Sequence, residues 1–354
     1  MSTFVVLPSP LLSRPGAVAA EAPDAGVAWH YGDPMAEQRA ALTSAGLVDE
    51  SHRALIAVSG ADRLTWLNTL TSQQLTDLAP GASTEALILS PQGHVEHHLT
   101  VDVAEDRVLL ETEAAAGDDL LGYLTGMIFW SDVQVVAASD LARLRVIGPR
   151  AAEIAAAAGH PSARITVPRG ELGRVATELI RAGARPIGSW AVTALRIAAR
   201  IPRWGLDIDA RTIPNELPWL ASAVHLHKGC YRGQETVARV DNLGRPPRRL
   251  VRLHLDGSVD RLPEPGDDLL NPTGRVVGRV GSAAHHWEDG PIALALVKRA
   301  VAAAAAPGAA PEPLLAGGVD AAIDPDDLDD PAAAGGAPPL SAVDRRAFTT
   351  LRRG

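Results

Sequence analysis

Residues 227–239 read His-Lys-Gly-Cys-Tyr-Arg-Gly-Gln-Glu-Thr-Val-Ala-Arg. The stretch holds the only cysteine of the chain, Cys230, and one of its two lysines, Lys228. Gly229 and Gly233 bracket the cysteine, and glycine allows backbone or ligand to approach closely. This concentration of rare residues makes the stretch the first candidate for a functional site.

A helix is predicted from the second of these glycines onward, with Gln234 and Glu235 in its first turn. Cys230 then lies just before the helix N-terminus, where amide groups carry partial positive charge and favour a thiolate. Lys228 and Arg232 add to this effect, while Glu235 opposes it. The stretch therefore predicts a reagent-accessible thiol of low pKa. The alternative is that Cys230 is a small buried hydrophobe, the commonest fate of a free cysteine.

The composition of the whole chain is that of a folded protein. Its 354 residues correspond to two or three domains at about 100–200 residues per domain. It is 46% hydrophobic and 21% charged, which excludes global disorder and a fibrous protein. The net charge of −9 argues against broad electrostatic binding to nucleic acid or to an anionic membrane, so neither partner is expected, and a local basic groove is the alternative. One cysteine excludes an internal disulfide framework and a cysteine-only metal site.

The N-terminal residues 1–26 are expected to form a flexible arm rather than a signal peptide. Pro8 and Pro10 break the apolar stretch of this segment, and no basic residue precedes it. Elsewhere no segment offers the ~20 uninterrupted apolar residues of a membrane span. We therefore expect a cytoplasmic protein.

Alternating strand-like and helical segments follow the arm and predict an α+β body over residues 27–244. Two successive units of similar element order indicate a pseudo-duplicated fold of split-βαβ type, with interleaved subdomains at about 45–140 and 141–244. The expected strands are 53–59, 86–90, 97–103, 107–113, 133–138, 143–147 and 163–167, and the expected helices begin near 62, 114, 150, 172 and 189.

Beyond Gly244 the pattern changes to short apolar runs separated by Gly, Pro, Asp and Asn. This spacing predicts a small antiparallel β-barrel or sandwich over 245–325, with a surface loop at 301–313. Residues 326–354 are poor in large apolar groups and begin with an acidic cluster, so we expect a disordered acidic tail there.

The motif Lys-Gly-Cys-Tyr-x-Gly-Gln-Glu at 228–235 resembles the signature of the YgfZ family of folate-binding proteins, which are relatives of the glycine cleavage T-protein, an aminomethyltransferase. The resemblance runs from about residue 45 to 325. It implies a GcvT-like body around a central folate site, followed by a small C-terminal antiparallel β-barrel. Further similar segments are 59–63, 66–68, 195–202, 213–216 and 279–281.

By this resemblance the protein supports assembly or repair of iron–sulfur clusters in client enzymes, including a tRNA-modifying one. Its cofactor would be tetrahydrofolate or a derivative, and its partners iron–sulfur client enzymes or assembly factors. Cys230 would be the functional thiol, kept anionic by Lys228 and Arg232. The other motif residues, of which the last two orient the loop or cap the helix, are Gly229, Tyr231, Gly233, Gln234 and Glu235.

A reduced folate needs an aromatic or apolar wall, polar groups along its pterin edge and cations for its glutamate tail. Trp190 is predicted as a folate contact because the family places such a tryptophan just before the Leu-Arg-Ile segment, although core packing is the alternative. Glu216 and Arg239 are predicted as polar folate contacts.

Two departures from the T-protein argue against glycine-cleavage aminomethyl transfer. His97 and His98 stand where the T-protein has an aspartate pair, and Ala198 stands where it has a glutamate. A neutral imidazole supplies no carboxylate charge beside a cationic centre. Whether the chain is an enzyme stays open at this point. The alternatives are a tetrahydrofolate-dependent one-carbon transferase or demethylase, and a non-catalytic scaffold for client enzymes.

A metal site formed by His94, His97 and His98 is not expected. In a strand, the first and third of these side chains share one face while His97 points to the other. The default interpretation is a solvated polar face.

Overall fold

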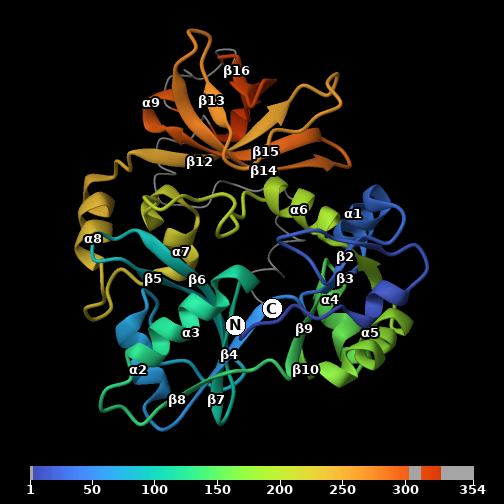
Figure 1. The fold of residues 1–354 in the computed structure, drawn as a ribbon, viewed down its shortest axis with the longest axis vertical. Helices are drawn as coiled ribbons and strands as arrows, with labels where there is room; N and C mark the ends of the chain where they lie inside the picture. The colour runs from blue at the N-terminus through green and yellow to red at the C-terminus, as the bar shows by residue number, and fades with distance from the viewer. Residues whose placement is uncertain (1–2, 303–311, 328–354) are drawn as a thin grey trace. The chain divides into compact units, whose positions relative to one another are not determined.

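The computed structural model describes residues 3–302 and 312–327, which form two compact units (Figure 1). The first unit comprises residues 3–86 and 97–192. The second comprises residues 87–96 together with the described residues from 193 onward. Residues 1–2, 303–311 and 328–354 lie outside the described part, and with them most of the predicted surface loop and acidic tail.

The first unit carries a five-stranded sheet with strand order β5-β6-β7-β4-β8. Strand β6 shows why this sequence forms a strand, since buried and half-buried residues alternate along its whole length. The strands are β4 (Ala54–Ser59), β5 (Ser83–Leu89), β6 (Val95–Val103), β7 (Arg107–Thr112) and β8 (Gln134–Ala137), and the helices that follow β4 and β7 are α2 (Arg63–Leu70) and α3 (Gly117–Gly126).

A second sheet of this unit has the order β10-β9-β3-β11, in which only the β3–β11 pair is parallel. Its apolar face packs against α4 and α5 through Leu47, Leu144, Ile154 and Leu179. The elements are β3 (Gly46–Asp49), β9 (Leu141–Ile147), β10 (Arg164–Pro168), β11 (Arg185–Ile187), α1 (Pro34–Thr43), α4 (Ala151–Ala157) and α5 (Leu172–Arg181). The predicted α+β body is thereby confirmed, although the sequence reasoning missed α1, β3 and β11.

The second unit contains a closed antiparallel barrel in the order β12-β15-β14-β13-β16-β17, as predicted. The barrel closes because β12 pairs with both β15 and β17. Small and branched residues such as Val251, Ala293 and Ala295 fill its interior. The strands are β12 (Arg248–Leu255), β13 (Asp268–Leu270), β14 (Val276–His286), β15 (Gly290–Lys298), β16 (Leu314–Ala316) and β17 (Val319–Ile323), and the short α9 (Arg299–Ala302) follows β15.

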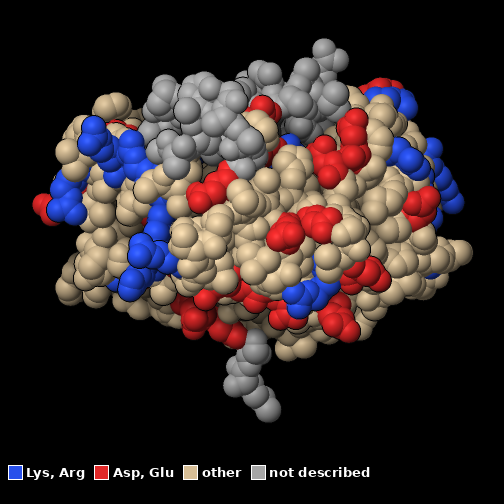
Figure 2. All heavy atoms as spheres, turned by 90° about the horizontal axis from the view of Figure 1, so that it is seen from above, with Lys and Arg blue, Asp and Glu red and all other residues tan. Residues whose placement is uncertain are grey.

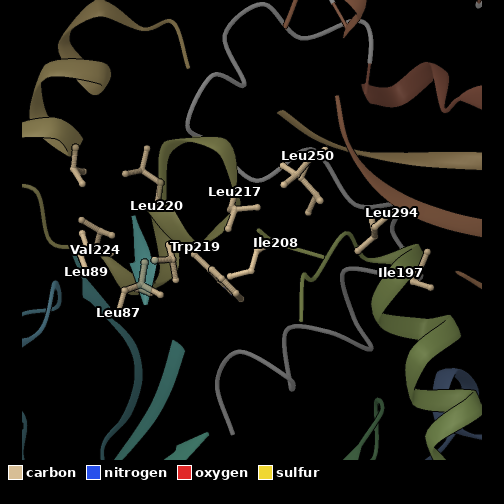
Figure 3. Close-up of a cluster of buried hydrophobic side chains, with 14 of the residues drawn as sticks. Leu87, Leu89, Ile197, Ile208, Leu217, Trp219, Leu220, Val224, Leu250 and Leu294 are labelled. Carbon is tan, nitrogen blue, oxygen red and sulfur yellow. The ribbon is translucent and has the colours of Figure 1, made fainter. Parts of the chain in front are cut away.

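One apolar cluster joins the barrel to the segments that precede it. Figure 3 shows Trp219, which is 2% exposed, among Leu87, Leu89 and Ile208. Leu294 of β15 belongs to the same cluster. The helices that contribute to it are the end of α6 (Ser189–Ala198), α7 (Trp219–Ala223) and α8 (Gln234–Leu243). Residues 193–244, predicted in the body, therefore lie with the barrel, because their apolar side chains pack there.

The structure also corrects the predicted boundaries at both ends. Within the expected flexible arm, Pro10–Ser13 forms a 3₁₀ helix. Leu11 is buried beside Leu47 of β3, and the buried Ser9 hydroxyl donates to Asp49. At the other end, the expected tail begins too early, because Asp327 is fully buried and paired with Arg200.

The described residues show no membrane-spanning helix and a mixed distribution of surface charge. None of the helices in 3–302 and 312–327 is long and apolar enough to cross a membrane. On the face shown in Figure 2, acidic and basic side chains are interspersed in small groups. The absence of direct nucleic-acid binding stays a prediction.

Candidate functional site

The cysteine motif forms a loop that leads directly into α8, as predicted. The helix begins at Gln234, after Gly233, and ends before Gly244. The Gln234 amide donates to the carbonyl oxygen of Tyr231 at 3.3 Å, which turns the loop into the helix. The side-chain amide of Gln234 donates to the carbonyl oxygen of Lys228 at 3.4 Å. Gln234 thus contacts both ends of the segment that contains Cys230.

Two glycines bring the turn between β5 and β6 against the start of α8. Gly233 has φ +81°, and a Cβ there would lie 2.5 Å from the carbonyl oxygen of Ser90. Gly93 of the turn has φ +83°, and a Cβ there would lie 2.7 Å from Cβ of Thr236. Both positions need the left-handed region and have no room for a side chain. The conformation of the motif therefore depends on contact with a segment about 140 residues earlier.

Strand β6 is held to the motif by Arg232. Its guanidinium contacts the Glu96 carboxylate, with Nη1 to Oε2 at 2.9 Å. The carbonyl oxygen of Glu96 accepts a hydrogen bond from Trp204 Nε1 at 2.9 Å. The Glu96 carboxylate therefore offsets part of the positive charge that Arg232 brings to the loop. Sequence reasoning missed Glu96 as its partner.

Lys228 is buried, although its side chain is cationic in ordinary conditions. Burial lowers its pKa to about 8. Its ammonium lies 5.5 Å from the ring centroid of Tyr231, within the range of a cation–π contact. Tyr231 is buried as well, and burial raises the pKa of its phenol to about 12. The two side chains on either side of the cysteine segment are thus packed inward.

Cys230 is exposed between these two buried residues. The alternative that it is a buried hydrophobe is therefore wrong. A thiol that is open to solvent, on a loop held by glycine contacts and by Gln234, can meet a partner molecule without rearrangement of the core. Its reactivity stays a prediction.

Glu216, a predicted folate contact, has a different partner in the structure. It ends the 3₁₀ helix Pro214–Glu216 and is 3% exposed. Both of its carboxylate oxygens accept from Arg248, each at 2.8 Å. This bidentate pair is the strong form of a charge-assisted hydrogen bond. Glu216 positions β12 through Arg248, and its contact with folate stays a prediction.

Two buried polar atoms near α8 have no hydrogen-bond partner in the described part of the chain. They are the side-chain oxygen of Asn215 and the hydroxyl of Tyr231. The Asn215 amide nitrogen donates to the carbonyl oxygen of Val237 in α8 at 3.2 Å. An unsatisfied buried polar atom costs about 1–3 kcal/mol, so each is available to a ligand or a water. Sequence reasoning missed Asn215.

Trp190 and Arg239 lie in different units. Trp190, in the first unit, stacks on Trp29, with ring centroids 4.6 Å apart and an interplanar angle of 22°. Trp29 lies in β2 (Ala28–His30), which pairs with β1 (Val18–Ala19). Trp29 is 43% exposed, so the stack presents an aromatic face to solvent. Arg239 lies exposed on α8 in the second unit.

The two histidines of β6 point to opposite faces of the strand, as predicted. His98 contacts Glu85, with Nε2 to Oε1 at 3.2 Å. His97 is buried, which corrects the expectation of a solvated polar face for this residue. Burial lowers its pKa to about 4, so it is neutral at pH 7. No group of three or more His, Cys, Asp or Glu side chains within 3–302 and 312–327 could hold a metal ion.

Two family models match separate parts of the chain. The GCVT N-terminal domain matches residues 11–166, and the CAF17 C-terminal β-barrel domain matches residues 248–329. The chain thus combines a GcvT-type N-terminal domain with a barrel of the YgfZ/CAF17 type. Both domains agree with the predicted GcvT-related YgfZ-type chain.

Curated relatives and a solved structure agree with this family. An aminomethyltransferase of Pseudomonas syringae pv. tomato is 27% identical over 217 residues, which are 52% of this chain and 60% of that protein. An aminomethyltransferase of Synechococcus is 27% identical, over 76% of this chain and 83% of that protein. The glycine cleavage system aminomethyltransferase T of Bartonella henselae has the same fold, with 22% identity, a TM-score of 0.76, and coverage of 93% and 98%.

Proposed function

We propose that this GcvT-related protein binds a reduced folate and supports assembly or repair of iron–sulfur clusters in client enzymes, including tRNA-modifying ones. The observation that carries the proposal is the exposed Cys230 on a loop whose neighbouring side chains are packed inward. Its partners would be client enzymes or cluster-assembly factors in the cytoplasm. The thiolate would bind iron or a cluster transiently, or meet a thiol of the partner.

The folate site would use the atoms that the fold leaves without partners. The Asn215 oxygen is a hydrogen-bond acceptor and the Tyr231 hydroxyl a donor, both beside apolar residues of one cluster. These suit a flat heterocycle that carries donors and acceptors along its edge. Arg239 offers an exposed cation for the glutamate tail. Trp190, in the first unit, stays a proposed folate contact on the family resemblance alone. A reduced folate is a carrier of one-carbon groups.

A tetrahydrofolate-dependent one-carbon transferase is the second candidate. It is favoured by the two relatives named above, both aminomethyltransferases at 27% identity. Aminomethyl transfer itself is disfavoured, because His97 is neutral at pH 7 where the T-protein has a carboxylate. A transferase of this family type would therefore act on another donor and use other residues. Turnover of a methylamine donor with tetrahydrofolate would support it.

Calorimetric titration of tetrahydrofolate into the reduced protein, under anaerobic conditions, tests the folate site. We expect saturable binding at one site per chain, with Kd near 1 μM, or about −8 kcal/mol. Asn215→Leu should weaken binding about tenfold or more, because a donor of the ligand loses its acceptor. Asp241→Ala, on the exposed end of α8, is the matched control and should leave Kd unchanged. Absence of binding at millimolar tetrahydrofolate would remove the folate part of the proposal.

A further inference from the structure

Two aromatic side chains project from the loop that joins α3 to β8. Phe129 is 70% exposed and Trp130 is 99% exposed. By contrast, Trp66 and Trp219 are buried, as expected for residues with so much apolar surface. Two adjacent exposed aromatic residues in a chain that is only 4% aromatic require an explanation other than packing within the first unit.

The loop that carries them is held at both of its ends. Trp66 Nε1 donates to the carbonyl oxygen of Met127 at 3.2 Å. The Asp132 amide donates to the Asp62 carboxylate at 2.8 Å, and the Asp62 amide donates to the carbonyl oxygen of Asp132 at 3.2 Å. Gly60, with φ +108°, has no room for a Cβ against the Asp132 backbone. The aromatic tip is therefore presented on an ordered base, which lowers the entropy cost of binding.

A further apolar side chain is exposed on the strand that follows the loop. The loop leads into β8, an edge strand of the five-stranded sheet that pairs with β4. Val136 of β8 is 45% exposed. Residues 129–136 thus carry three exposed apolar side chains, and two of them are aromatic, the type enriched at protein interfaces.

Acidic residues border the base of the loop. Asp62 and Asp132 lie in it, and the turn at Glu105 and Asp106 is joined to it through Arg63, whose guanidinium donates to the carbonyl oxygen of Glu105 at 2.8 Å. Arg107 pairs with Asp106 at 3.1 Å. The base of the loop and this turn thus carry four carboxylates and two guanidinium groups. This excess of negative charge disfavours an anionic membrane or nucleic acid and complements a basic surface.

We propose that the loop 127–133 is a docking site for a partner protein, with Phe129 and Trp130 inserted into an apolar pocket bordered by Lys or Arg. The proposal stands on exposure, loop geometry and charge, and it does not depend on folate or on Cys230. If the function proposed above holds, this is the surface through which a client enzyme or assembly factor is held.

The test begins by placing a photoreactive benzoylphenylalanine at position 130 of the full chain, in cells. The control position is Leu243, an apolar residue 66% exposed on α8. We expect one discrete protein to be cross-linked from position 130 and not from 243. The cross-linked protein is then purified, and its affinity for the full chain is measured at low and high salt.

The double variant Phe129→Ser/Trp130→Ser should weaken this binding at least tenfold, while the melting temperature and tetrahydrofolate binding stay unchanged. Glu105→Lys should weaken it and reduce its salt dependence. Unchanged affinity of the double variant, or no cross-link from position 130, would overturn the proposal. So would binding of the wild-type tip to vesicles of anionic phospholipid, or self-association that the double variant abolishes, because the occupant would then be a membrane or a second copy.

Discussion

At the scale of single residues, the structure separates the two glycines that flank Cys230. Gly233 has a positive φ and touches the turn at Ser90, whereas a Cβ at Gly229 would meet nothing within 4 Å. Gly233→Ala should therefore lower the free energy of unfolding by more than about 1 kcal/mol, because alanine disfavours this φ and meets the Ser90 carbonyl. Urea denaturation measures the change, and Gly229→Ala is the matched control. Equal stability of the two variants would contradict the geometry.

Lys228 should make stability depend on pH in the alkaline range. Burial lowers its pKa from 10.5 to about 8, so between these values the unfolded chain binds more protons than the folded chain. The contribution of Lys228 to the free energy of unfolding therefore rises as pH increases from about 8 towards 10.5. In Lys228→Met this rise should disappear, whereas Lys298→Met should retain it. Urea midpoints measured at pH 7.5 and 10 would show it, and identical pH profiles for wild type and Lys228→Met would refute it.

The residue types of the motif were sufficient to predict that Cys230 lies in a loop just before a helix, because Gly233 and the helix-forming residues after it are neighbours in the sequence. The partners of Arg232 and Glu216 were not predictable. Arg232 pairs with Glu96, 136 positions away, and Glu216 with Arg248, 32 positions away. No local pattern records which distant charge the fold brings into contact. For the same reason, the sequence did not reveal the burial of Lys228.

At the scale of secondary-structure elements, the short 3₁₀ helix Pro325–Asp327 should be a structural part of the second unit. Its Asp327 carboxylate accepts from Arg200 Nε and from the Arg252 amide, each at 2.6 Å. Asp327→Ala should cost about 3–5 kcal/mol of stability, because it leaves a buried Arg200 without this partner. Asp326→Ala, exposed one residue earlier, is the control and should change stability little. A small loss in Asp327→Ala would show that the helix contributes little.

Most strands and helices were predictable because their apolar residues have a clear period. Strand β6 is an example, with every second residue buried from Val95 to Val103. Strands β3 and β11 were missed, since each is only three or four residues long and is defined by pairing with a partner far along the chain. The ends were misjudged for a related reason. Leu11 and Asp327 are buried in segments that are mostly exposed, and only tertiary contact shows their burial.

At the scale of the whole molecule, the sequence predicted the α+β body and the barrel but not how they share the chain. The tip of the β5–β6 hairpin, residues 87–96, belongs to the unit of the barrel, although both its strands belong to the sheet of the first unit. Composition shifts mark linkers, and none occurs at residues 87 or 192. The motif and the hairpin tip thus form one site that is assembled from distant parts of the chain.

We propose above that Cys230 is the functional thiol of a folate-binding protein that maintains iron–sulfur enzymes. The most direct test is complementation of a deletion strain under oxidative stress, measured as the activity of a cluster-dependent enzyme. Cys230→Ser should fail to restore this activity, while His227→Ala, an exposed neighbour in the same loop, should restore it fully. Full restoration by Cys230→Ser would contradict the account and favour a scaffold whose thiol has no role.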